Sequence, residues 1–300
     1  MDRDHFIIAV YCLVCEHYQA VAASARIRRG GFAPALTDEE VITIEICGEY
    51  LKGGTDKDIF AYFRAHYRAF FPCLRDRSRF VRQAASLWRV KELIQRRLTV
   101  VSGQAADPVQ VIDTLPLPVC GYTRSRRDRC FKPLADYGHC AAKQLDYYGF
   151  KLGLRIARSG MIIAYPLLPA RPHDSQLLDD LVDGFSGAVP ADKGFIGAVR
   201  QALLAERHAV LVITPPRKGM TTPHPRCLLR ACARIRKGVE TVGSHLTERF
   251  AVARIRVHDL WHYQHRLIRK ILAHTVGVFL NLHLGRDPLD LDGLVPAEPR

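Results

Sequence analysis

The pattern of apolar and polar positions changes once along the chain, near residues 103–108. Before that point, apolar residues recur at helical spacing. The sequence Thr-Asp-Glu-Glu at residues 37–40 is a capping box and begins a helix that ends at Gly53. Thr55 can begin a second helix and Ser78 a third. We therefore predict an all-α N-terminal domain over residues 1–105, and its consecutive short helices with basic outer faces fit either a DNA reader or a plain helical bundle.

After residue 105 the pattern alternates between strands and helices. Strands are predicted at residues 109–113, 150–156, 161–168, 188–192 and 208–214, and helices after Asp174, through 199–204 and over 229–282. This order predicts an α/β domain over residues 106–285, with a mixed sheet flanked by helices. The proline-containing residues 286–300 are expected to form a disordered tail.

The charge of the chain points to a polyanionic partner. It has 44 Lys and Arg residues against 30 Asp and Glu residues, a formal net charge of +14. Nucleic acid is the leading candidate, and a membrane surface is the second. The apolar run at residues 6–15 is too short to span a bilayer and follows two aspartates, which argues against a membrane anchor or a secretory signal. Nine cysteines, an odd number set mostly among apolar residues, indicate reduced thiols and a cytoplasmic location.

Basic residues gather in two segments. Seven of them, and no acid, lie between residues 217 and 237, and a second group lies at residues 124–132 beside Tyr122 and Phe131. Such segments bind phosphates, although a solvated face or a mobile loop would have the same composition. The DNA-binding candidates are Arg124, Arg126, Arg127, Lys193, Arg217, Lys218, Arg236 and Lys237. A late helix also carries a stripe of basic residues, which we interpret as polar or DNA-facing: His258, His262, His265, Arg266 and Arg269.

Three acids are placed where a mixed sheet could bring them together. Asp113 and Asp192 each end a predicted strand, and Glu240 lies on a later helix. Carboxylates are hard ligands that suit Mg²⁺ or Mn²⁺, and two such ions can clamp a scissile phosphate. The spacing alone leaves other interpretations open, since the two aspartates could be turn or loop acids and Glu240 could pair with Arg236. Other acids of the same chemical kind are Asp136, Asp146, Asp174 and Glu248.

Three segments carry a resemblance to a known family. They are residues 111–114 with Pro116 to Cys120, residues 191–196, and residues 236–241 around Glu240. Together with residues 40–51 and 80–88, they resemble bacterial insertion-sequence transposases, most closely the insertion-sequence 982 family. The resemblance implies a ribonuclease-H-like fold, a Mg²⁺ requirement, and Asp113, Asp192 and Glu240 as the metal ligands. Two positions depart from the pattern, since Ala233 and Thr247 stand where relatives often have Tyr and Lys.

The resemblance also implies a function. The chain would be a DNA transposase that binds the terminal inverted repeats of its own element, cuts there, and joins the 3′-hydroxyl ends to target DNA with two metal ions. Bringing two DNA ends together favours a homodimer or a larger assembly on DNA. Two alternatives remain: an inactive DNA-binding remnant of a transposase, and a metal-dependent nuclease of the same fold.

Overall fold

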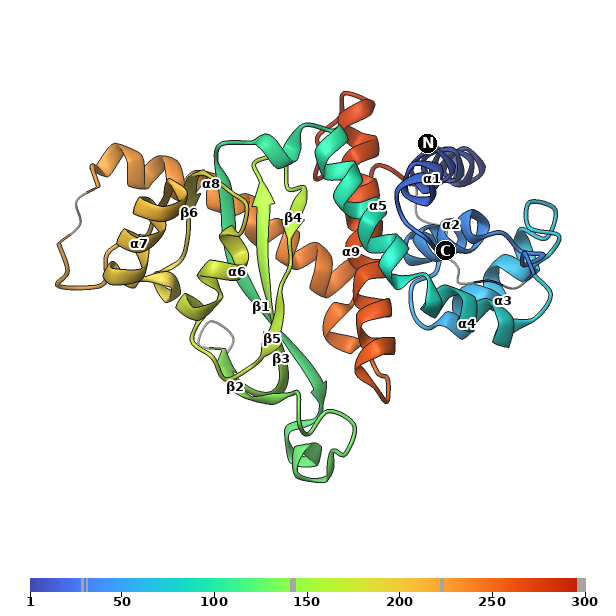
Figure 1. The fold of residues 1–300 in the computed structure, drawn as a ribbon, viewed down its shortest axis with the longest axis horizontal. Coiled ribbons are helices and arrows are strands. Elements are labelled where there is room, and N and C mark those ends of the chain that lie inside the picture. Colours follow the sequence, from blue (N-terminus) through green and yellow to red (C-terminus); the bar gives the residue numbers. More distant parts are fainter. Residues whose placement is uncertain (28–29, 31, 141–143, 222–223, 296–300) are drawn as a thin grey trace. The chain divides into compact units, whose positions relative to one another are not determined.

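The computed structural model describes the chain except residues 28–29, 31, 141–143, 222–223 and 296–300. The chain divides into two compact units, drawn as ribbons in Figure 1. The first contains residues 1–102 and 248–300, and the second contains residues 103–247. Each unit has its own core and is described separately.

The first unit is built on helices. They are α1 (Arg3–Ser24), α2 (Asp38–Leu51), α3 (Asp56–His66), α4 (Arg77–Ser86), α5 (Trp88–Val101) and α9 (Leu260–His283). The capping box before α2 is confirmed, since the Thr37 side chain accepts from the Glu40 amide and Glu40 accepts from the Thr37 amide. The prediction that Ser78 caps the third helix is wrong. The Asp76 side chain accepts from the Arg79 amide instead, so Ser78 lies inside the first turn of α4.

The last helical stretch differs from the prediction of one helix over residues 229–282. Helix α8 (Arg226–Ser244) ends in a π-helical turn at His245–Arg249, and a 3-10 turn at Val252–Arg254 precedes α9. Helix α9 packs with α2 and α5 in the first unit, so the unit that contains the predicted acids ends at residue 247 rather than 285. Residues 286–295 of the expected disordered tail are folded, because Leu291 and Leu294 are buried. Residues 296–300 lie outside the described residues.

Charged residues of α9 form a buried network, so the interpretation of a polar or DNA-facing stripe is wrong for His265 and Arg269. Both side chains are about 1% exposed. Arg269 donates to Glu49 at 2.6 Å and pairs with Asp56, while Lys91 donates to Glu45 at 2.7 Å. Glu49 of α2 and Asp56 of α3 lie more than 200 residues before Arg269 in the sequence. The pattern of α9 alone therefore cannot show that its basic residues have buried partners.

Helix α1 is the one described helix that is long and apolar enough to cross a membrane. A single such helix near an N-terminus is weak evidence, because buried helices of globular proteins pass the same test. One face of α1, with Phe6, Val10 and Val14, is buried, and the helix contacts α2 and α5. These contacts bury about one third of the apolar window of α1.

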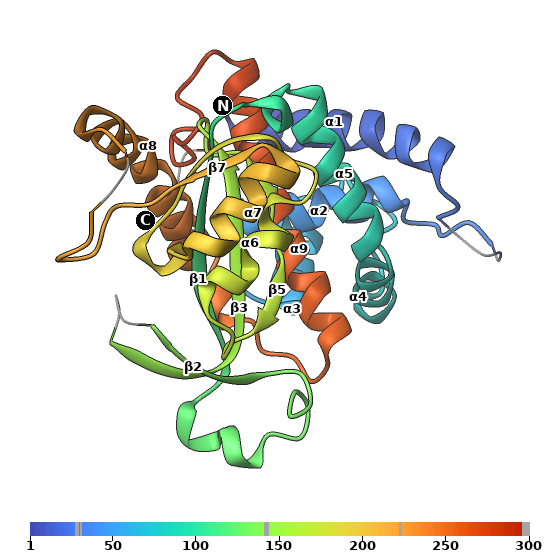
Figure 2. The same ribbon diagram turned by 60° about the vertical axis from the view of Figure 1, so that its left-hand side comes forward.

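The second unit contains a five-stranded antiparallel sheet and a two-stranded parallel sheet. The antiparallel sheet comprises β1 (Gln110–Cys120), β2 (Asp136–Cys140), β3 (Leu145–Ala157), β4 (Ile162–Ala164) and β5 (Leu167–Pro169). The long strands β1 and β3 lie side by side (Figure 2). The parallel pair β6 (Gly187–Pro190) and β7 (Val210–Ile213) joins β1 through a parallel bridge between Val109 and Ala188. Helices α6 (Leu178–Val182), α7 (Ala198–His208) and α8 complete the unit. The predicted mixed α/β class is confirmed.

Strand β1 does not end at Asp113, as we had expected from the prolines that follow. It continues through Pro116 and Pro118 to Cys120, paired with β3 along one edge. A proline lacks the N–H donor, but this costs nothing on an edge without a partner strand. The parallel bridge to β6 lies at Val109, at the start of β1, so the prolines fall where this edge has no ladder to break. Asp113 therefore lies within the strand, opposite Leu154.

The core of this unit lies between the sheet and its short helices. Ile112 of β1, Leu181 of α6, Val189 of β6 and Val210 of β7 are fully buried and belong to one apolar cluster. Burying a side chain of this size contributes about 1.5–3 kcal/mol. The cluster fixes the positions at which β1 and β6 present their polar residues to solvent.

Candidate active site

The three predicted acids line one cavity of the second unit. The cavity has a volume of about 1080 Å³, and Asp113, Asp192 and Glu240 are all in its wall. They come from three separate elements: β1, the turn after β6, and α8. The fold thus brings together residues that are 79 and 48 positions apart in the sequence.

Asp113 is the most buried of the three acids. Its carboxylate accepts a hydrogen bond from the Thr114 amide at 2.8 Å. Burial raises the pKa of Asp113 from 3.8 to about 6, and the negative charges of Asp192 and Asp174 act in the same direction. The Thr114 hydrogen bond and the Arg236 cation lower this pKa but do not offset burial. The surrounding positive charge is therefore not enough to stabilise the ionised form of Asp113 in this cavity.

Asp192 lies two residues after the end of β6. The Ala191 amide donates to the Ile213 carbonyl at 3.0 Å, which ties the end of β6 to β7. Asp192 then precedes the short turn Lys193–Phe195, anchored by buried Phe195. Its side chain is exposed and lies 3.5 Å from the Arg236 guanidinium. The predicted position at a strand end is correct for this residue.

Glu240 lies on the exposed side of α8, one turn after Arg236. The opposite side of the helix buries Val239 and Val242, and α8 contacts β1 and β6. Among the described residues, Arg236 forms its ion pair with Asp192 and none with Glu240, so the intrahelical pair that the sequence left open is not formed. Packing of α8 against the sheet places Glu240 in the cavity wall.

A fourth carboxylate, that of Asp174, also lines the cavity. The sequence predicts a helix after Asp174, but the His173 side chain caps the turn at this place, and Asp174 pairs with Lys151 of β3 at 2.7 Å. Lys151 also donates to the Pro172 carbonyl at 2.8 Å. An added Cβ on Gly194 would meet the Asp174 carboxylate at 2.8 Å, so the turn after Asp192 lies directly against Asp174. The sequence indicates Asp174 only as one of several further acids that could bind a metal ion, and nothing in its local pattern predicts its place in this cavity.

The predicted DNA-binding residues are mostly exposed. Arg124, Arg126 and Arg127 lie on the 3-10 turn Tyr122–Arg127, Lys193 follows Asp192, and Lys218 and Lys237 are exposed. Arg217 lies near the Lys193 carbonyl, at 3.4 Å. Arg236 differs from the others because it is partly buried and faces two acids. Of these predicted residues, Arg236 is in the wall of the cavity that holds the three acids.

The donor chemistry of the cavity fits a hard divalent cation. Its carboxylates provide oxygen ligands, and the raised pKa of Asp113 marks a place where added positive charge is favourable. Outside the masked positions, no three His, Cys, Asp or Glu side chains are close enough to hold one ion together. Asp192 and Glu240 are exposed, so their side chains can change rotamer. Such a rotation would bring their carboxylates toward Asp113 when a metal ion binds.

Carboxylates from separate elements that line one cavity, with cationic side chains in the same wall, suit an enzyme that acts on phosphodiesters. In a comparison with protein families, the model for the transposase DDE domain matches residues 103–259, more than half of the chain. The chain belongs to this family of DNA cleavage and transfer enzymes. No curated protein and no solved structure matches the chain.

Proposed function

We propose that the protein is the DNA transposase of a bacterial insertion sequence, related by its motifs to the insertion-sequence 982 family. It would bind the terminal inverted repeats, cut at the ends of the element, and join the 3′-hydroxyl ends to target DNA. One observation carries this proposal: three carboxylates from separate elements line a single cavity in a chain of the transposase DDE-domain family. The net charge of +14 supports DNA as the partner.

The strand order supports a ribonuclease-H-like fold for the catalytic part. Strand β1 has β3 antiparallel on one side and is bridged to the parallel pair β6 and β7. Helix α8 then brings Glu240 to the sheet. The family match continues to residue 259, which supports a catalytic segment that extends beyond the compact unit.

Asp113, Asp192 and Glu240 would hold two Mg²⁺ or Mn²⁺ ions. When bound, such ions lower the pKa of the attacking hydroxyl or water and stabilise the departing oxygen. Arg236 forms an ion pair with Asp192 in the metal-free protein. Once a metal ion balances the charge of Asp192, the Arg236 guanidinium would be free to bind a DNA phosphate. Exposed Lys193, Arg217 and Lys218 would hold the DNA backbone across the cavity.

The helical N-terminal residues would bind the DNA ends, and two copies would act together. Helix α4 supports this role because it presents Arg79 and Arg82, three positions apart, on one exposed side, while Phe80 is buried. Arginines on one helix face are a suitable surface for phosphates. A protein that cuts and joins DNA of the bacterial chromosome would be located in the cytoplasm.

The test is incubation with DNA that carries the ends of the element, in Mg²⁺ and in chelator, scored for both nicking and joining. The wild-type protein should nick and join only with metal. Asp113→Asn should bind the same DNA and do neither, while Asp180→Asn, which changes an exposed acid of α6, should keep both activities. Undiminished nicking by Asp113→Asn would remove this residue from the mechanism. Nicking without joining would indicate a nuclease, and binding without either would indicate an inactive remnant.

A further inference from the structure

Two exposed tyrosines stand at the mouth of the acidic cavity. Tyr122 is 52% exposed and Tyr137 is 42% exposed. Their ring centroids are 5.7 Å apart in an edge-to-face arrangement, and both residues line the same cavity as Asp113. Tyrosine usually buries most of its ring, so a neighbouring pair this exposed leaves apolar ring faces open for a flat partner.

The tyrosines are held in place by the loop that carries them. The Ser125 hydroxyl lies 2.6 Å from the Tyr122 carbonyl and 2.9 Å from the Tyr137 hydroxyl. Tyr137 also packs against Tyr148 of β3, with ring centroids 5.1 Å apart. A ring fixed in this way loses little conformational entropy when a second ring stacks on it.

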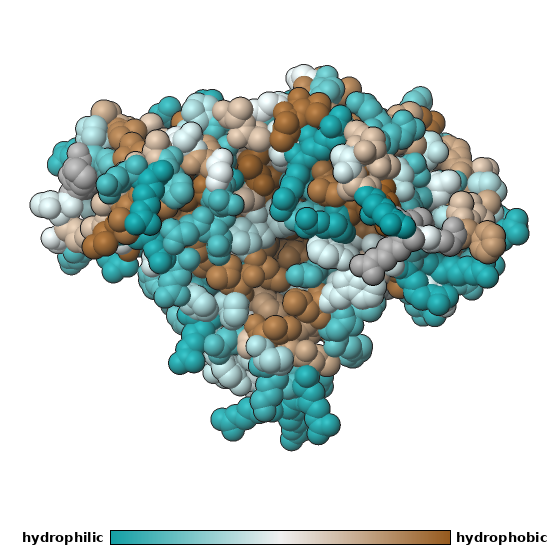
Figure 3. All heavy atoms as spheres, in the orientation of Figure 1, coloured by the Kyte–Doolittle hydropathy of each residue, from teal (hydrophilic) through white to brown (hydrophobic). Residues whose placement is uncertain are grey.

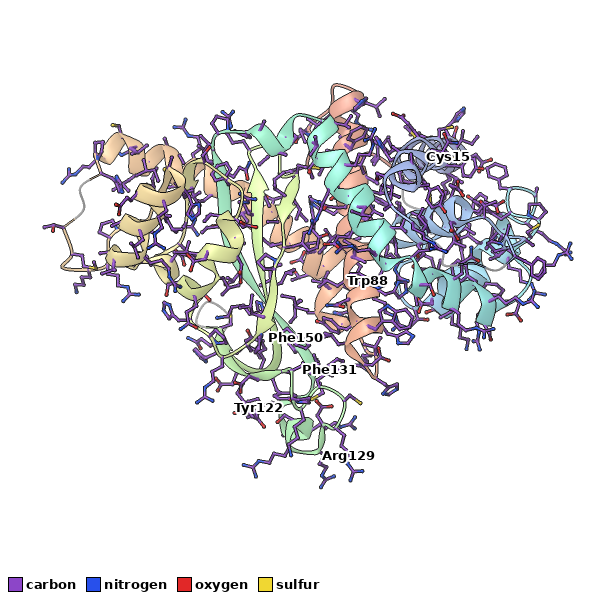
Figure 4. The ribbon with its side chains drawn as sticks, viewed as in Figure 1. Cys15, Trp88, Tyr122, Arg129, Phe131 and Phe150 are labelled. Atoms are coloured by element: carbon purple, nitrogen blue, oxygen red, sulfur yellow. The ribbon has the colours of Figure 1, made fainter. Side chains whose placement is uncertain are left out.

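The rest of the loop is anchored and basic. Buried Phe131 packs edge-to-face on Phe150 of β3, with ring centroids 5.8 Å apart, and Figure 4 shows Phe150 at the lower part of the sheet with Phe131, Tyr122 and Arg129 below it. The exposed cations at residues 121–135 are Arg124, Arg126, Arg127, Arg129 and Lys132, against one acid, Asp128. The loop is the hydrophilic tip at the foot of the view in Figure 3. Its charge suits the phosphates of one strand, and its tyrosines suit the bases.

We propose that Tyr122 and Tyr137 form a stacking site for an unpaired nucleobase, next to the phosphate that meets the acids. The inference rests on the proposed function, since it takes the cavity as the place of the scissile strand. An unpaired base fits better than a paired one, because only a base outside the duplex stack exposes its faces to a protein ring. The cations of the same loop would bind the phosphates on either side of that base.

The experiment measures DNA binding without added divalent metal, so that no strand is cut. The probes are a fluorescein-labelled blunt duplex and the same duplex ending in a short single-stranded thymine tract. The wild-type protein should bind the thymine-ended probe about tenfold more tightly, as stacking of one base on an aromatic ring predicts. Tyr122→Ala should lose this preference and keep its affinity for the blunt duplex. Tyr122→Phe, which keeps the ring, should retain the preference.

A matched variant separates stacking from charge. Arg126→Ala, on the same turn, should weaken binding of both probes alike and reduce the dependence of affinity on salt. Equal binding of the two probes by the wild-type protein would overturn the inference. So would a Tyr122→Ala protein that keeps the preference, or one that loses affinity for both probes equally, as a purely structural role predicts.

The result is separable from the proposed reaction. If the wild-type protein prefers the unpaired end but never nicks DNA in Mg²⁺, the stacking site stands and the enzymatic proposal fails. If it nicks and joins DNA but shows no preference, the enzymatic proposal stands and the stacking site fails.

Discussion

Replacement of Asp113 by Asn tests the electrostatics of the cavity. Burial raises the pKa of Asp113 from 3.8 to about 6, so at pH 7 the folded protein carries an ionised carboxylate that the fold disfavours. The folded and unfolded pKa values of Asp113 differ by about two, and each pKa unit is worth ~1.4 kcal/mol. The folded protein is therefore about 3 kcal/mol less stable at pH 7 than it would be without this shift. Asn keeps the shape and removes the charge. Asp113→Asn should therefore stabilise the metal-free protein.

The sign of the pH dependence follows from the raised pKa. Well below pH 3.8 the wild-type carboxyl is protonated in both the folded and unfolded states, so the variant should gain almost nothing there. As the pH rises from about 4 to the folded pKa of about 6, the wild-type protein loses this stability and the variant does not. At pH 7 the melting temperature of the variant should be higher by roughly 6–12 °C, because each kcal/mol shifts it by about 2–4 °C in a protein of this size.

The assay is thermal unfolding in chelator and in Mg²⁺ at pH 3.5 and 7. Metal binding should raise the melting temperature of the wild-type protein at pH 7, and this rise should be lost in Asp113→Asn. Asp180→Asn serves as the control for loss of an exposed negative charge. The reasoning is refuted if Asp113→Asn is no more stable than the wild-type protein at pH 7 in chelator, or if Mg²⁺ stabilises both equally.

Three further changes test other parts of the account. Arg236→Ala removes a cation that lowers the pKa of Asp113, so the acid limb of the pH–cleavage profile should move to higher pH, whereas Arg236→Lys should move it less. Lys91→Met leaves Glu45 buried without its 2.7 Å partner and should cost about 3–5 kcal/mol in urea unfolding, part of which Lys91→Met with Glu45→Leu should restore. Arg217→Ala should reduce the slope of log affinity against log salt by about 1, and an unchanged slope would exclude a phosphate contact.

The sequence was most informative where local chemistry decides the structure. The capping box at Thr37 and the change from helical to alternating pattern near residue 105 depend on neighbouring residues, and both agree with the structure. The five predicted strands each overlap an observed strand, because their apolar residues fill one core. Asp192 was placed at the end of its strand for the same reason.

The sequence was least informative where distant residues decide the structure. Strand β2 was not predicted, because its residues are mostly polar or exposed and it is held by pairing with β3. The place of Asp174 in the cavity depends on Lys151, 23 residues away on β3. The basic side of α9 was interpreted as a surface because its buried partners, among them Glu49, lie more than 200 residues away.

The central claim is that Asp113, Asp192 and Glu240 share bound metal. The most direct measurement is a crystal structure of the full chain grown with Mn²⁺, with anomalous scattering used to locate the ions. The account predicts an ion within about 2.0–2.3 Å of an Asp113 oxygen and of an oxygen from at least one of Asp192 and Glu240. Manganese bound elsewhere, with these three carboxylates left without an ion, would contradict it.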